Sequence, residues 1–192
     1  MIGYLKLRKQ VLSRLAADLP DSLTYHGVDH TLDVLQVCNQ YIRRLNLPIE
    51  DRYMLRTGAI VHDMGFLKEP SNHEEVGAEM AEGILKELGV GSGQIDVIKG
   101  LVMATKIPQK PKTHLEQIIC DADLDYLGRK DYPEISHKLF LELRNMKSIS
   151  TEEEWRNLQI NFLKSHQFHT SFAQGYREPQ KQIWLKTLLN GK

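Results

Sequence analysis

The chain of 192 residues has little cysteine and no long apolar run. Its two cysteines, Cys38 and Cys120, lie far apart and form no Cys-x-x-Cys pair, so we expect two small buried thiols in a reducing compartment. No apolar stretch approaches the length of a membrane span, and residues 1–10 mix Lys6, Arg8 and Lys9 with apolar residues instead of forming the core of a signal peptide. These absences predict a cytoplasmic protein with no membrane partner.

An excess of charge of either sign is also missing. Lysine plus arginine and aspartate plus glutamate number 25 each, so the formal net charge is zero. Such a chain has no global field that would favour a nucleic acid polymer or an anionic membrane. Any phosphate must therefore be met by a local group of positive side chains. The composition, 41% hydrophobic and 26% charged, is that of an ordinary globular protein, and the length favours one domain over residues 1–192.

Helical periodicity recurs along the chain, and the alternating pattern of strands is almost absent. Helices are expected around residues 11–19, 28–45, 76–88, 95–102, 115–122, 139–143, 155–168 and 172–189, with another ending near 61–65. Ser92 could cap one helix, Pro179 could break the last, and residues 106–112 form a loop. Trp155 and Trp184 occupy core-like positions, with no ligand role expected. The pattern predicts an all-α domain of roughly orthogonal helices.

Polar side chains of metal-binding types occur next to apolar runs. They are His26 and His30, the pair His62-Asp63, the pair His73-Glu74, and Asp121, Asp123 and Asp125. His62-Asp63 closes the run 59–61, so both side chains are expected at a helix end buried in the core. Uncompensated carboxylates cost free energy in such surroundings, and a divalent cation would offset that cost. Imidazole plus carboxylate suits Mn, Fe, Co, Ni or Zn.

The order of these motifs resembles the HD-domain superfamily of metal-dependent phosphohydrolases. The resemblance rests on the stretches Tyr25–Val34, Ala59–Phe66 and Cys120–Gly128, and it covers residues from about 25 to 130. Carried over position by position, it implies that one divalent metal is bound by His30, His62, Asp63 and Asp123. Asp123 is preferred to Asp121 because the family's Ala-Asp dipeptide aligns with Ala122-Asp123. The ligand types do not distinguish Mn, Fe, Co, Ni, Mg and Zn.

The first stretch is also similar to the Tyr-His-x-x-x-His-x-x-Asp-Val segment of cyclic-nucleotide phosphodiesterases. That similarity nominates His26 as proton donor to the leaving oxygen, although the residues after Asp63 do not follow the phosphodiesterase pattern. Asp63 would both bind the metal and orient the attacking hydroxide. The substrate would be a small phosphorylated molecule, most plausibly a nucleotide. Its contacts are predicted at His73 and, for the phosphoryl oxygens, at Lys106, Lys110 or Lys112 and at Arg129 or Lys130.

Several alternatives stay open at this point. A second metal at His73 is disfavoured, because the next histidine that binuclear members of the superfamily need would be expected near Thr105. The same absence disfavours the di-iron oxygenases built on this fold. The chain could also be a cyclic-nucleotide phosphodiesterase, or a catalytically silent signalling domain that binds a nucleotide without cleaving it. Asp121 and Asp125 are either partners that orient ligands or surface acids. The oligomeric state is not predicted.

Overall fold

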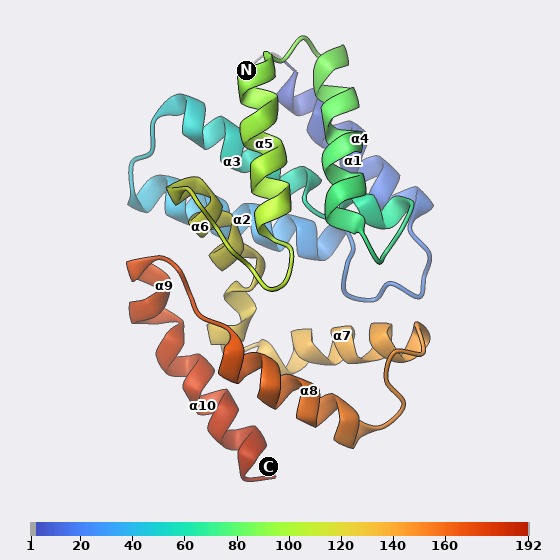
Figure 1. The fold of residues 1–192 in the computed structure, drawn as a ribbon, viewed down its shortest axis with the longest axis vertical. Coiled ribbons are helices and arrows are strands. Elements are labelled where there is room, and N and C mark those ends of the chain that lie inside the picture. The colour runs from blue at the N-terminus through green and yellow to red at the C-terminus, as the bar shows by residue number, and fades with distance from the viewer. Residues whose placement is uncertain (1–2, 192) are drawn as a thin grey trace. The chain divides into compact units, whose positions relative to one another are not determined.

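A computed structural model describes residues 3–191, and helices account for all of their regular secondary structure (Figure 1). No strand occurs among these residues, so the all-α prediction is confirmed. The described chain divides into two compact units. The first unit contains residues 3–20 and 26–123, and the second contains residues 21–25 and 124–191. The expectation that residues 1–192 form one domain stays a prediction, and each unit is described by itself.

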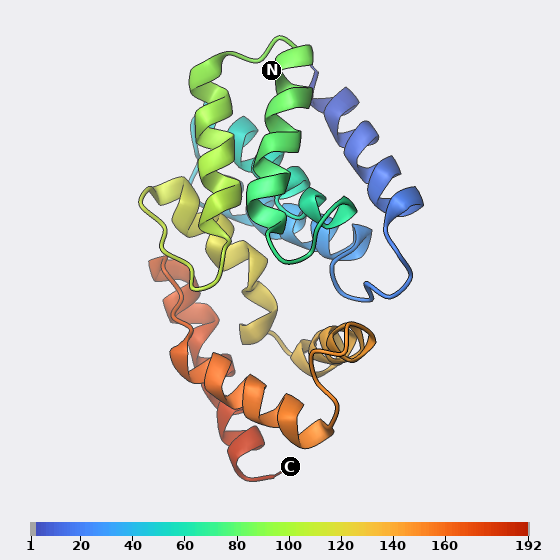
Figure 2. The same ribbon diagram turned by 45° about the vertical axis from the view of Figure 1, so that its right-hand side comes forward.

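The first unit contains six α-helices and one 3-10 helix among its described residues. They are α1 (Tyr4–Asp18), α2 (Val28–Arg44), α3 (Ile49–Val61), η1 (Met64–Leu67), α4 (His73–Glu87), α5 (Ser92–Ala104) and α6 (His114–Asp123). Helix α2 packs on α3 and α6, and α5 packs on α3, α4 and α6. Figure 2 shows α4 and α5 running side by side. Cys38 and Cys120 are both buried and form no disulfide, as expected for small core residues.

The bounds of α2 and α3 decide where the polar motifs lie. Gly27 is the N-cap of α2, so His26 lies just outside this helix and His30 lies in its first turn. Helix α3 ends at Val61, and His62 is its C-cap. The apolar run 59–61 is fully buried, and it carries the next two residues into the interior of the unit. His62 and Asp63 therefore lie at a buried helix end, as the sequence predicts.

Close packing of η1 on α4 brings a further histidine to this region. A Cβ atom at Gly65 would come within 1.9 Å of the carbonyl oxygen of His73 and 2.8 Å of the backbone nitrogen of Gly77. Only glycine allows this approach, which holds the start of α4 against the segment that follows Asp63.

The second unit contains η2 (Asp125–Gly128), α7 (Tyr132–Asn145), α8 (Glu152–Ser165), α9 (Ser171–Tyr176) and α10 (Glu178–Leu189). Helix α10 packs on α8, α9 and η2. Its core is rich in aromatic residues, with Tyr126, Tyr132 and Phe168 all buried. Helix α8 begins with a capping box, in which the Thr151 hydroxyl accepts from the backbone N–H of Glu154 and the Glu154 carboxylate accepts from that of Thr151.

Some helix ends differ from the sequence-based expectation. The N-cap of α5 is Gly91 and makes no side-chain cap, so the expectation that Ser92 caps this helix is wrong. The last helical stretch breaks at Arg177. Pro179 does not interrupt α10, because it lies in the first turn, where the N–H that proline lacks would have no partner within the helix. Among residues 3–191 we find no helix with both the length and the apolar character needed to cross a bilayer.

Candidate metal centre

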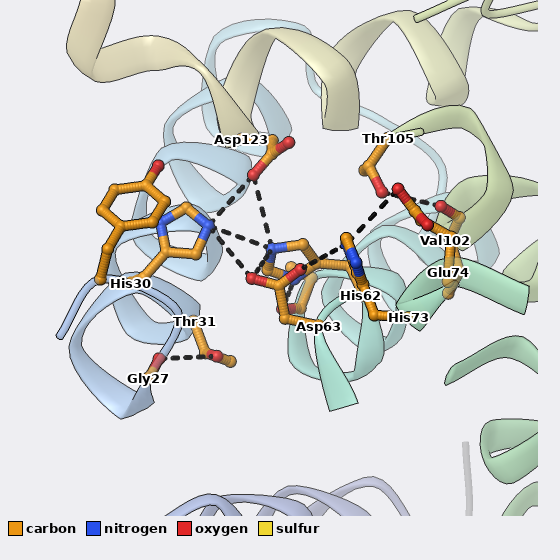
Figure 3. Close-up of polar contacts among 12 residues, drawn as sticks. Gly27, His30, Thr31, His62, Asp63, His73, Glu74, Val102, Thr105 and Asp123 are labelled. Carbon is orange, nitrogen blue, oxygen red and sulfur yellow. Dashed lines mark hydrogen bonds and ion pairs between the residues drawn. The ribbon is translucent and has the colours of Figure 1, made fainter. Parts of the chain in front are cut away.

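Three helix ends of the first unit supply the predicted metal ligands. Figure 3 shows the side chains of His30 from α2, His62 and Asp63 from the end of α3, and Asp123 from the end of α6 pointing toward one another. His30 and His62 are 8% and 0% exposed, and Asp63 is 6% exposed. Residues separated by up to 93 positions thus meet in a buried polar cluster.

The distances between the polar atoms fit the ligands of one small cation. The Nε2 atom of His30 lies 3.1 Å from Asp123 Oδ1 and 3.3 Å from His62 Nε2, and His62 Nε2 lies 3.5 Å from Asp123 Oδ1. His30, His62 and Asp123 thus each offer one ligand atom within 4.8 Å of the others. Ligand atoms at about 2.1 Å from one ion would lie about 3.0 to 3.4 Å apart. The cluster has the spacing that such an ion requires.

Asp63 borders the same two imidazoles. Its Oδ2 atom lies 3.2 Å from His62 Nε2 and 3.4 Å from His30 Nε2. This oxygen is buried and accepts no hydrogen bond within the described chain. A buried carboxylate oxygen without a donor is costly, and a metal ion at this point would remove the cost. Asp63 therefore fits a metal ligand better than it fits a purely structural acid.

A backbone contact sets the tautomer of His62 for metal binding. The Nδ1–H of His62 donates to the carbonyl oxygen of Ala59 over 3.0 Å, because a carbonyl can only accept. In the neutral imidazole this leaves the lone pair on Nε2, the atom that faces His30 and the two carboxylates. The α3 C-terminus thus orients His62 as a ligand through its own backbone.

The charges of the cluster depend on one another. Burial alone would lower the pKa of His62, but the Asp63 and Asp123 carboxylates raise this pKa well above its ordinary value. Burial opposes the ionisation of both acids, yet the neighbouring histidines lower the pKa of Asp63 and hold that of Asp123 at about 2. Two ionised carboxylates at this depth demand positive charge, which a divalent cation also supplies.

An aromatic contact links the other two predicted site histidines. His26 stacks on Phe66 at a centroid distance of 4.2 Å, and Phe66 stacks on His73 at 4.1 Å. The Nε2 atom of His73 lies 3.8 Å from Asp63 Oδ1 and 3.4 Å from Glu74 Oε1 (Figure 3). The structure therefore brings His73 beside Asp63, and Phe66 lies between two of the predicted site residues. The sequence analysis gave Phe66 no role, although it belongs to the motif that contains His62-Asp63.

The predicted phosphate-binding cations are engaged elsewhere or exposed. Lys106 forms an ion pair with Glu75, a contact that raises the pKa of Lys106 and lowers that of Glu75. Lys110 is exposed. Arg129 belongs to the second unit, where its guanidinium contacts Asp131 at 2.6 Å and Asp125 at 3.7 Å. A role of these cations in substrate binding stays a prediction.

The acids flanking Asp123 are not surface residues. Asp121 is fully buried, and Asp125 is 1% exposed. The Nε–H of Arg177 donates to Asp125 Oδ1 over 2.7 Å. The alternative that these acids lie on the surface is therefore wrong.

Comparison with protein families gives one match. The model of the HD domain family matches residues 27–125, which is just over half of the chain and includes His30, His62, Asp63 and Asp123. Members of this family bind divalent metals and are generally hydrolases of the metal-dependent phosphohydrolase superfamily, although some are catalytically inactive. Comparison with curated proteins found no significant match, and comparison with solved structures found none either. On the extent of this match, the chain belongs to the HD domain family.

Proposed function

We propose that the chain is a metal-dependent phosphohydrolase that cleaves a phosphoester or phosphoanhydride of a small molecule, with a nucleotide as the favoured substrate class. The metal would be held by His30, His62, Asp63 and Asp123. The observation that carries this proposal is the meeting of two imidazole Nε2 atoms with the carboxylates of the buried Asp63 and the partly buried Asp123, at distances of 3.1 to 3.5 Å. Family membership supports hydrolysis as the reaction class.

When bound, the divalent cation would acidify a water molecule and polarise a phosphoryl oxygen. The protein's own contribution starts at Asp63. Its Oδ2 atom faces the two imidazoles, and its Oδ1 atom faces His73. One carboxylate can therefore serve as a ligand through Oδ2 and accept a hydrogen bond from the attacking water through Oδ1. On this geometry, Asp63 is the proposed group that orients the attacking water.

His26 and His73 would act on the substrate side. The ring of His26 lies 5.9 Å from that of His30 and 6.1 Å from that of His73, and both His26 and His73 are partly exposed. A protonated His26 would donate to the leaving oxygen. His73, held between Asp63 and Glu74, would donate to a phosphoryl oxygen. Phe66 would hold both rings at fixed orientations by stacking.

The experiment is a hydrolysis panel with a matched pair of variants. Nucleoside monophosphates, diphosphates, triphosphates and cyclic phosphates are incubated with the full chain in Mn²⁺ or Co²⁺, and released phosphate or nucleotide is measured. We expect turnover of at least one class, and its reduction to background in His62→Ala. His114→Ala is the control, because His114 is exposed at the other end of α6 and should keep wild-type turnover. If no substrate of the panel is turned over in either metal, the proposed hydrolase activity is rejected.

The panel also tests the two other functions. A cyclic-nucleotide phosphodiesterase is favoured by the position of His26 beside His30, and it predicts that only cyclic substrates turn over and that His26→Ala loses most of this activity. A silent nucleotide-binding domain predicts no turnover, and nucleotide binding that His62→Ala leaves unchanged.

A further inference from the structure

The second unit carries a pocket that the metal centre does not use. Its volume is about 230 Å³, and it lies between α7, α8 and α10. The lining includes Tyr132 and Ser136 from α7, Trp155 and Gln159 from α8, and Trp184 and Leu188 from α10. In each helix the two residues are four positions apart and share one face. We call this the aromatic pocket.

Both tryptophans of the chain line the aromatic pocket, and both rings are partly exposed. Trp184 stacks on Tyr132 at a centroid distance of 5.6 Å, and its Nε1–H donates to the carbonyl oxygen of Arg129 over 2.7 Å. Trp155 stacks on Phe140 at 5.8 Å. These contacts fix both indole rings in advance, so a bound ring would stack on them at little further cost in conformational entropy.

A buried amide gives the pocket a hydrogen-bonding group. Gln159 is 8% exposed, and its Nε2–H donates to the Tyr132 hydroxyl over 2.7 Å. The amide oxygen Oε1 of the same side chain is an acceptor with two lone pairs. A ligand that offers an N–H in the pocket can donate to this oxygen.

The lining of the aromatic pocket holds no side chain with a permanent charge, and His137 and Tyr132 are its titratable members. Burial raises the pKa of Tyr132 to about 12, so its phenol stays neutral. No carboxylate, lysine or arginine belongs to the lining, which favours a ligand without formal charge on the part that enters. The volume lies below the range of about 300 to 1,000 Å³ that is usual for drug-sized ligands, so one ring system fits better than a whole nucleotide.

We propose that the aromatic pocket binds a neutral, planar nitrogen heterocycle of the size of a purine or pyrimidine base, stacked on a tryptophan ring and donating an N–H to Gln159 Oε1. The site lies outside the residues that match the HD domain family, and the sequence analysis expected no ligand role for the tryptophans. It would give the chain a second ligand besides the phosphorylated substrate.

The test uses the two tryptophans as reporters. The full chain is titrated with adenosine and with uridine, which carry no phosphoryl group, and tryptophan fluorescence is recorded. We expect saturable quenching by at least one nucleoside. Trp155→Phe and Trp184→Phe each leave one reporter and keep an aromatic ring, and we expect saturable quenching in both variants with the same Kd within a few fold. Quenching that never saturates, or that only one reporter shows, would overturn the proposal.

A matched pair of glutamine variants tests the hydrogen bond. Gln159→Leu should weaken the Kd by about 2- to 10-fold, the loss of one neutral hydrogen bond. Gln182→Leu, on the exposed face of α10, should leave the Kd unchanged. The titration is repeated in a chelator, and the same Kd is expected, because the pocket does not depend on the metal centre. Equal Kd values for wild type and Gln159→Leu, or loss of binding in the chelator, would reject the site. If Gln159→Leu is unfolded by circular dichroism, the two single-tryptophan variants decide the question.

Discussion

Each unit of the chain contains carboxylates that are buried or partly buried, and the two sets are met by different partners. In the first unit, Asp63 and Asp123 face the Nε2 atoms of His30 and His62. In the second unit, Asp125 faces the guanidinium groups of Arg177 and Arg129 at 2.7 and 3.7 Å. Asp123 and Asp125 are separated by one residue in the sequence, yet their surroundings differ in chemistry.

The comparison shows that burial alone does not identify a metal ligand. Arginine has no lone pair to offer a cation, and it pairs with a carboxylate as a permanent positive charge. Histidine offers a lone pair once it loses its proton, so a carboxylate beside histidines can share a cation with them. The partner of the acid decides between a structural ion pair and a metal centre.

The largest effect is expected when Asp123 and Asp125 are replaced by asparagine in two separate variants. Asp123→Asn should weaken Mn²⁺ binding by more than about 100-fold, since even the outer partners of metal ligands cost 10- to 100-fold. Asp125→Asn should keep the wild-type affinity for Mn²⁺ and lose stability instead. Isothermal titration with Mn²⁺ measures the first effect, and thermal unfolding measures the second. Equal Mn²⁺ affinities in the two variants would show that Asp123 and Asp125 do not differ in their contribution to metal binding.

Removal of the arginine partner should destabilise the second unit without touching the metal centre. Arg177→Met removes the nearer of the two guanidinium groups that face the buried Asp125 carboxylate, and we expect a loss of about 3 kcal/mol in the free energy of unfolding. Arg14→Met breaks the exposed pair with Asp18 and should cost less than about 1 kcal/mol. Urea unfolding compares the two variants. Equal losses would mean that the buried pair is no stronger than a surface pair.

Gly65 and Gly83 differ in the space around them, and the third prediction compares their substitution by alanine. Gly65→Ala should cost about 2 kcal/mol of stability, because its Cβ would collide with the His73 carbonyl oxygen. It should also displace His73 and lower turnover. Gly83→Ala in α4 has open space at its Cβ and should stabilise the chain by up to about 1 kcal/mol. Thermal unfolding and turnover are measured on both. A Gly65→Ala variant with wild-type stability would contradict the close contact of η1 with α4.

The smallest effect is expected at the aromatic contact between the site histidines. Phe66→Leu removes the stacking surface of His26 and His73, and kcat should fall about tenfold, equivalent to about 1.4 kcal/mol, with metal content unchanged. Phe140→Leu is the control, because this buried phenylalanine of the second unit stacks on Trp155. The control should lose stability to a similar degree and keep kcat. Equal kcat values in the two variants would deny Phe66 a positioning role.

Local patterns predicted where the helices lie, although α1 and α7 begin seven residues before the expected stretches 11–19 and 139–143, and the family resemblance supplied the four ligand candidates. The run 59–61 carries His62-Asp63 into the core because apolar helix ends bury whatever follows them. The sequence left open whether Asp125 is buried, because its partner Arg177 lies 52 positions away and no local pattern connects them. The contact of Phe66 with the site histidines could not be predicted for the same reason, since its stacking on His26 depends on where η1 lies against α2 and α4. The N-cap of α5 was misplaced by one residue because serine is a better cap by type than glycine, whereas the structure has Gly91 at this position.

The metal content of the purified chain tests whether His30, His62, Asp63 and Asp123 form a metal centre. The full chain is stripped with a chelator, dialysed against Mn²⁺ at micromolar concentration, and analysed for metal per chain beside His30→Ala treated in the same way. We expect about one ion per chain in the wild type and a value near zero in the variant. Metal-free wild-type protein, or an unchanged metal content in His30→Ala, would contradict a cation held between the two imidazoles and the carboxylates of Asp63 and Asp123.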